Sequence, residues 1–152
     1  MNEEKVRYVS YPINKDIFKV LSMPVIEINL YGKSHLFLLD TGCNDIIICE
    51  KAAKSLKVKV QTDSEDTYSV SGIIDKQTDI VRGKIHIKVG NVDAEIECNV
   101  VDISPVNTII SKSKELKKLK LSGILGSAFF FDYSWVLDFH RLVVGYPEIF
   151  TE

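Results

Sequence analysis

Residues 36–48 read LFLLDTGCNDIII, in which the tripeptide Asp40-Thr41-Gly42 separates two apolar runs. Short apolar runs bounded by turn residues are typical of buried strands. Gly42 allows a sharp turn because glycine has no Cβ to collide with the backbone. This stretch therefore predicts a strand, a tight turn and a second strand, with the carboxylate of Asp40 at the end of an apolar wall.

The tripeptide alone is weak evidence of function, because Asp, Thr and Gly are ordinary turn residues after a strand. At average residue usage, a chain of this length contains an Asp-Thr-Gly by chance with odds of roughly 3%. A second motif lies far downstream, where residues 122–131 read SGILGSAFFF and place an apolar pair before Gly126. The apolar runs around the first motif and the presence of the second together favour a functional site.

The two motifs make a recognisable order: a strand, Asp-Thr-Gly, a second strand, and later Ile124-Leu125-Gly126 opening a short helix. This order resembles the retropepsin-like aspartic proteases, in particular their single-domain bacterial and retroviral-type members, over roughly residues 24–145. Residues 68–75 (YSVSGIID) are similar to a flap hairpin, and 135–139 (WVLDF) to the strand after the helix. The resemblance implies one protease domain over residues 1–152, mostly β, folded as a closed β-barrel with one or two short helices.

The resemblance also implies roles for the motif residues. Asp40 would be the catalytic carboxylate, contributed by each of two subunits. Thr41 would hydrogen-bond across the two-fold axis, and Gly42 would allow close approach to the carboxylates. The Ile124-Leu125-Gly126 stretch would pack beneath the turn as an apolar floor. Substrate contacts in the cleft and the flap would come from Asn44, Tyr68, Ser71, Gly72 and Ile73.

This chain departs from the family pattern beside the first motif. Cys43 stands where members usually carry Ala, Ser or Thr. Retroviral members pair an Asp after this position with an Arg after the second motif, whereas this chain has Asn44 and Ser127. The stabilisation of the dimer by that pair therefore does not carry over. Cys43 is either a packing residue, which we favour, or an oxidation-sensitive thiol beside the cleft.

Hydrolysis of a peptide bond by water needs a base for the water and an acid for the departing groups. Two carboxylates that share one proton supply both. The sequence has one Asp-Thr-Gly, and none of its other aspartates precedes Thr-Gly or Ser-Gly. We therefore predict a homodimeric aspartic endopeptidase acting on extended peptides. The alternatives are a catalytically impaired protease-fold module for peptide binding or dimerisation, and a chance Asp-Thr-Gly in an unrelated β-barrel.

Alternating apolar and polar residues predict two hairpins, which join 25–30 to 36–39 and 84–89 to 94–100. Helical signals fall in three short stretches, 50–56, 111–119 and 127–131. The lysines in and directly after the second stretch suggest either nucleic-acid binding or a solvated helix face. Leu116 and Leu119 recur there at helical spacing and favour the solvated face. The lysines concerned are Lys112, Lys114, Lys117, Lys118 and Lys120.

Composition excludes several other classes. The formal net charge of −2 gives no basic face for nucleic acid, and no apolar run is long enough to predict a membrane span. The glycines are isolated and His35, His86 and His140 are scattered, so we predict no cofactor and no metal. The three cysteines leave one thiol over, and the start MNEEK lacks a signal-peptide pattern. We therefore expect a reducing, cytoplasmic setting, although a removed leader would leave no trace here.

Overall fold

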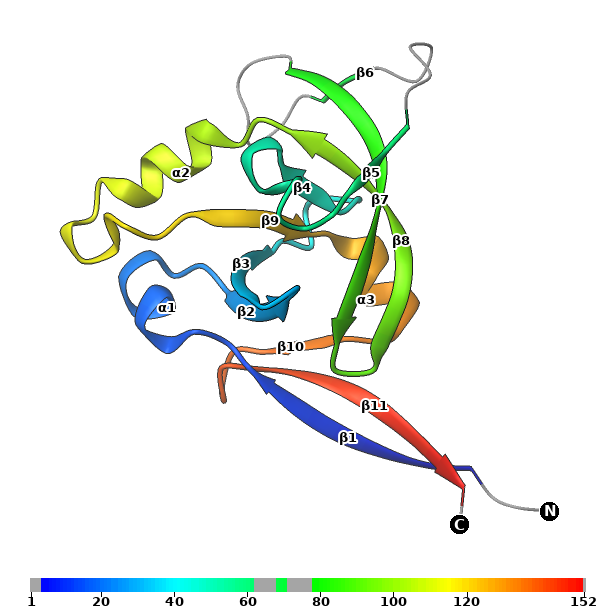
Figure 1. Cartoon of the computed structure of the whole chain (residues 1–152). Coiled ribbons are helices and arrows are strands. Elements are labelled where there is room, and N and C mark those ends of the chain that lie inside the picture. The colour runs from blue at the N-terminus through cyan, green and yellow to red at the C-terminus, as the bar shows by residue number, and fades with distance from the viewer. Residues whose placement is uncertain (1–3, 62–67, 71–77, 152) are drawn as a thin grey trace.

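The computed structural model describes residues 4–61, 68–70 and 78–151. They form two β-sheets, three α-helices and two short 3-10 helices (Figure 1). No helix in these ranges is long and apolar enough to cross a membrane. In chain order the elements are β1 (Glu4–Pro12), α1 (Lys15–Leu21), β2 (Val25–Leu30), β3 (Lys33–Leu39), β4 (Ile47–Cys49), η1 (Glu50–Ala52), β5 (Lys59–Val60), β6 (Tyr68–Val70), β7 (Thr78–Val89), β8 (Val92–Val101), α2 (Ser104–Ser111), η3 (Lys114–Leu116), β9 (Leu121–Leu125), α3 (Ser127–Tyr133), β10 (Val136–Asp138) and β11 (Val143–Thr151).

The larger sheet brings the two sequence motifs together. Its strand order is β2-β3-β9-β4-β8-β7-β5, and β6 pairs with β7 off this path. Both predicted hairpins are confirmed, as β2–β3 and β7–β8. Strand β9, which carries the second motif, lies parallel to β3 and antiparallel to β4. The strands on either side of the Asp-Thr-Gly turn therefore both pair with the strand that precedes Gly126.

The predicted closed barrel is not confirmed. The sheet ends at β2 and β5, and no ladder joins these two strands in the described ranges. Closure requires every strand to pair on both edges with a consistent stagger. Strand β5 has only two residues, and its pairing is with β7.

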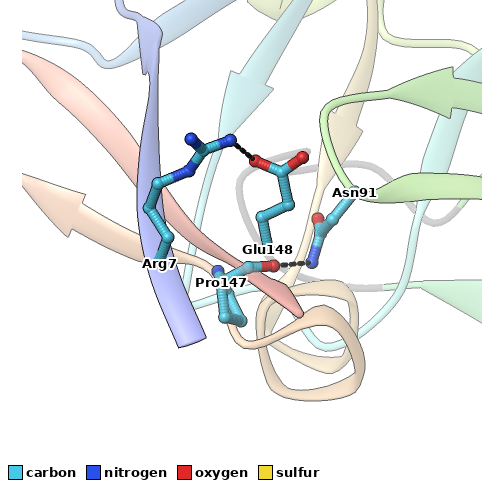
Figure 2. Close-up of polar contacts among 4 residues, drawn as sticks. All are labelled: Arg7, Asn91, Pro147 and Glu148. Atoms are coloured by element: carbon cyan, nitrogen blue, oxygen red, sulfur yellow. Dashed lines mark hydrogen bonds and ion pairs between the residues drawn. The ribbon is translucent and has the colours of Figure 1, made fainter. Parts of the chain in front are cut away.

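A second sheet has the strand order β1-β11-β10. Its two long strands, β1 and β11, were not predicted. Strand β1 pairs with β11 from Glu4↔Thr151 to Pro12↔Val143 and forms an arm below the larger sheet (Figure 1). Arg7 and Glu148 face each other across this arm at 2.6 Å, as Figure 2 shows. Because both side chains are exposed, we expect this ion pair to add little stability.

The core lies on both faces of the larger sheet. Phe37 and Leu39 of β3 belong to one buried cluster, whereas Leu38 between them belongs to another. Helices α1 and α2 cover the second face through Ile17 and Ile110. Burial on both faces explains why β3 reads as a continuous apolar run instead of an alternating one.

The helix predictions had mixed outcomes. The helix predicted at 127–131 is confirmed as α3, whereas 50–56 contains only η1 and turns. The prediction at 111–119 was wrong, because α2 starts earlier and only its last residue and η3 lie in that range. The Asp102 carboxylate accepts a hydrogen bond from Ser104 N at 2.9 Å, which fixes the earlier start. Helix α1, capped by Asn14, makes three α-helices in the described residues instead of the one or two predicted.

Candidate functional site

The Asp-Thr-Gly turn is closed by its own hydrogen bonds. Where β3 ends, Asp40 N donates to Leu125 O of the second motif at 3.0 Å. The Asp40 side chain accepts from Gly42 N at 2.9 Å, and Cys43 N donates to Asp40 O at 3.1 Å. A turn braced in this way holds the carboxylate in one place at the end of the strand.

This turn reaches the surface although the strands around it are buried. Asp40 is half-buried, whereas Thr41 and Gly42 are exposed. By contrast, Leu39 before the turn is 3% exposed and Ile46 after it is 4% exposed. The framework is therefore part of the core, while the motif itself is accessible to another molecule.

The second motif supports this turn through backbone contacts. An added Cβ at Gly126 would lie against the carbonyl oxygen of Asp45 and 2.5 Å from that of Cys43, so only glycine fits. The next two backbone N–H groups donate to the loop, Ser127 N to Cys43 O at 2.7 Å and Ala128 N to Asn44 O at 3.1 Å. The first turn of a helix has free N–H groups, and here the loop carbonyls satisfy two of them.

The two apolar residues of the second motif pack on opposite faces of the sheet. Ile124 lies in the same buried cluster as Leu38 and Ile47, whereas Leu125 lies in the cluster of Phe37. Both are almost completely buried. The stretch predicted as an apolar floor thus lies directly beside the turn, where Asp40 N bonds Leu125 O.

A polar pair that the sequence analysis missed lies at the other end of the loop. Asn99 of β8 is only 6% exposed, and its Nδ2 donates to the carboxylate of Asp45 at 3.3 Å. Asn99 N also donates to Ile46 O at 2.9 Å. The available signal was an Asn inside the apolar run 98–101 (CNVV), since buried polar side chains need partners.

A small hollow opens beside this polar pair. Arg82 and Glu97, on neighbouring strands, bring one charge of each sign to it, and both side chains are exposed. The lining consists of Asp45, Gln61, Arg82, Gly83, Glu97, Cys98 and Asn99.

Cys43 points back into its own loop. Its thiol contacts Asp45 O at 3.5 Å. Burial raises the pKa of the Cys43 thiol, and the nearby carboxylates of Asp40 and Asp45 raise it further, against the opposing effect of that backbone contact. A thiol with a raised pKa is a poor nucleophile, which favours the packing role.

The structure describes only part of the predicted cleft. Asn44 is exposed beside the turn, and Tyr68 lies on β6, opposite Ile80 of β7. Ser71, Gly72 and Ile73 of the predicted flap lie outside the described residues. Among the described residues, no three His, Cys, Asp or Glu side chains converge to hold a metal ion.

Comparisons with known proteins agree with this geometry. The sequence model of the family described as aspartyl protease matches residues 26–129. A retropepsin-like aspartic protease from Rickettsia conorii is similar in structure, with a TM-score of 0.53, 16% identity and 95% of each chain covered. The retroviral protease-like domain of Ddi1 from Leishmania major also has a TM-score of 0.53, with 11% identity, 84% of this chain and 94% of that chain covered. A comparison with curated proteins found no significant match. The fold is therefore retropepsin-like.

Proposed function

Because this chain belongs to the aspartyl protease family, we propose that it is an aspartic endopeptidase that works as a homodimer, with Asp40 as the catalytic residue of each copy. The observation that carries the proposal is the braced turn, which presents the Asp40 carboxylate at the surface end of a buried strand. One chain supplies one such carboxylate, and a second copy would supply the other.

In the proposed mechanism the two Asp40 carboxyl groups lie about 3 Å apart and share one proton, because two charges so close cannot both persist. The charged group takes a proton from water, which then attacks the peptide carbonyl carbon. The neutral group donates its proton to the carbonyl oxygen. The carboxyl group that took the proton from water then donates it to the amine nitrogen as the C–N bond breaks, and one hydroxyl of the resulting diol returns its proton to the other carboxylate.

The neighbouring residues have supporting roles in this proposal. Exposed Thr41 would hydrogen-bond to the partner's turn, and Gly42 would leave room for substrate. Ile124-Leu125-Gly126 would keep the underside of the carboxylate pair dry. Asn44 and the flap residues Tyr68, Ser71, Gly72 and Ile73 would contact an extended peptide.

The three cysteines are all free thiols, which supports a reducing, cytoplasmic setting.

The proposal is tested with Asp40→Asn, which keeps the shape of the side chain but removes its acid–base chemistry. We expect cleavage of a peptide library to fall by about a thousandfold or more, with the thermal midpoint of unfolding little changed. Asp93→Asn, at an exposed aspartate on β8, is the matched control and should cleave as wild type does. Equal cleavage by Asp40→Asn would contradict the mechanism. A folded wild type that binds peptides and cleaves none would favour the impaired module.

A further inference from the structure

We propose that Asn99 is a positioning residue for catalysis, which acts through Asp45 to hold the loop after the Asp-Thr-Gly turn. This inference rests on the proposed function, because it concerns the geometry of the same site. Its basis is the bond from Asn99 Nδ2 to Asp45 Oδ2, which joins residues 54 positions apart in the sequence.

Asn99 is anchored far more firmly than the residue it holds. It lies in the middle of the larger sheet, paired with Ile47 of β4 on one side and Arg82 of β7 on the other. Asn99 is buried, with only 6% of the residue exposed. Asp45 is exposed and belongs to no helix or strand. The buried, strand-paired partner therefore determines where the carboxylate of the exposed partner lies.

The loop from Cys43 to Asp45 is held from two sides. On one side, the N–H groups of Ser127 and Ala128 hold the carbonyls of Cys43 and Asn44. On the other side, Asn99 holds the Asp45 side chain. Since Cys43 N also bonds Asp40 O, a rotation of this loop would move the catalytic turn.

An amide–carboxylate pair suits this partly solvated position, where Asn99 is buried and Asp45 is exposed. An amide next to a carboxylate must present its N–H side, because its oxygen would repel the negative charge. Such a pair orients the carboxylate without burying a second charge, which would be strongly unfavourable if left unpaired. Asn44 and Ser127, which bracket the loop contacts, carry no charge. The Asp45–Asn99 bond supplies a side-chain restraint on this loop.

Asn99→Asp gives the sharpest test, because it places two carboxyl groups face to face. At acid pH one of them is protonated and donates to the other, so the restraint survives. As the pH rises both ionise and repel, and the loop is pushed away. The other charged or titratable groups at this hollow are Arg82, Glu97 and the Cys98 thiol, and burial raises the pKa of that thiol to about 12.

We would measure kcat and KM of each variant from about pH 4.5 to about pH 7.5 and divide each kcat by the wild-type value at the same pH, which cancels the titration of the catalytic pair. For Asn99→Asp we expect the ratio to fall by about tenfold or more as the pH rises, with KM changed less. The double variant Asp45→Asn with Asn99→Asp restores an amide–carboxylate bond with its direction reversed. We expect the kcat of this double variant, divided by the wild-type kcat, to stay close to one at every pH.

Controls separate positioning from folding. Asp45→Asn alone keeps a neutral amide pair, so it should fold and lose a few-fold in kcat without pH dependence. Asp93→Asn, on the same strand, should match wild type at every pH. The inference would be overturned if folded, active Asn99→Asp kept a kcat ratio to wild type that does not change with pH. It would also be overturned if the double variant lost kcat with rising pH as Asn99→Asp does. Failure of Asn99→Asp to fold together with full activity of Asp45→Asn would overturn it too. A wild type without any cleavage would instead overturn the proposed function, and this inference with it.

Discussion

At the scale of single residues, Gly126 has the strictest requirement in the site. The carbonyl groups of Cys43 and Asp45 occupy the space that a Cβ would need. Both obstacles are backbone atoms of a braced loop, so neither can swing away as a long side chain would. Packing the loop so closely places the first N–H groups of α3 within hydrogen-bond distance of its carbonyls.

We therefore expect Gly126→Ala to destabilise the fold by about 1–3 kcal/mol or more and to reduce cleavage further than that loss explains, because the motif loop must shift. Gly145→Ala is the matched control, since its added Cβ would meet only Tyr8 and Val136 at ordinary contact distances. Denaturant unfolding and peptide cleavage measure the two effects. Equal stability of both variants would show that the loop adapts freely.

His35 is a second residue whose surroundings set a measurable property. It is 6% exposed on β3, and its Nδ1 lies 2.9 Å from Ser122 Oγ. Its Nε2 has no hydrogen-bond partner in the described structure. Burial lowers the pKa of His35, and the nearby charge of Lys33 lowers it further. The folded chain therefore resists protonation here more than the unfolded chain does.

It follows that the unfolded state binds the extra proton first as the pH falls below about 6.5, so stability drops with falling pH. In His35→Gln, which is neutral throughout, the loss of stability between about pH 7 and about pH 5 should be smaller than in wild type. His140→Gln changes an exposed histidine and should leave the wild-type slope. Thermal midpoints across this range give the comparison. Parallel curves for wild type and His35→Gln would contradict the assignment.

At the scale of elements, the side chain of Asn91 joins three parts of the chain. It lies in the β7–β8 turn and accepts a hydrogen bond from Trp135 Nε1 at 2.7 Å. Its Nδ2 donates to Tyr133 O at 3.0 Å and to Pro147 O at 3.4 Å, the second of which Figure 2 shows. The turn is thereby tied to the end of α3 and to β11. The ring of Trp135 also packs against that of Phe129, with 4.9 Å between the ring centroids.

Asn91→Ala should cost about 1–3 kcal/mol of unfolding free energy, chiefly because the Trp135 N–H loses its partner. The control is Asp93→Asn. It changes an exposed polar contact on the same hairpin, in which His86 Nε2 lies 2.6 Å from Asp93 Oδ1. That change should stay within about 0.5 kcal/mol. Urea unfolding of the two variants makes the comparison. A loss in Asn91→Ala no larger than in the control would show that the tie is not structural.

At the scale of the whole molecule, the proposed chemistry belongs to a pair of chains. In that proposal each copy presents one carboxylate on an exposed turn, and two turns would meet to form one catalytic centre. Stability and activity should then depend on protein concentration, because only the assembled form is complete.

Mixing gives a direct test of this requirement. If subunits exchange at random and a mixed pair is inactive, adding an equal amount of Asp40→Asn to wild type should lower cleavage to about half, because half of the wild-type pairs are lost. Adding the same amount of active Asp93→Asn should instead raise cleavage about twofold. Cleavage that stays unchanged after Asp40→Asn is added would show that each chain acts alone.

The sequence predictions that the structure confirmed were based on patterns of neighbouring residues. The alternation in 25–39 and 84–100 identified two hairpins, and the Ile124-Leu125-Gly126 motif identified the start of the short helix α3. Errors arose where local signals were weak or shared. The lysines after Ser111 masked the end of α2, and the long strands β1 and β11 depend on each other across the full length of the chain.

The sequence by itself determined the retropepsin-like family, the turn that carries Asp40 and the strands on either side of it, because these depend on the order and period of neighbouring residues. Only the tertiary structure decided what braces that turn: the close packing of Gly126 against the loop, and the bond between Asn99 and Asp45. The physical reason is that each such contact joins segments far apart in the chain. Their meeting is set by how whole sheets pack, which no local pattern records.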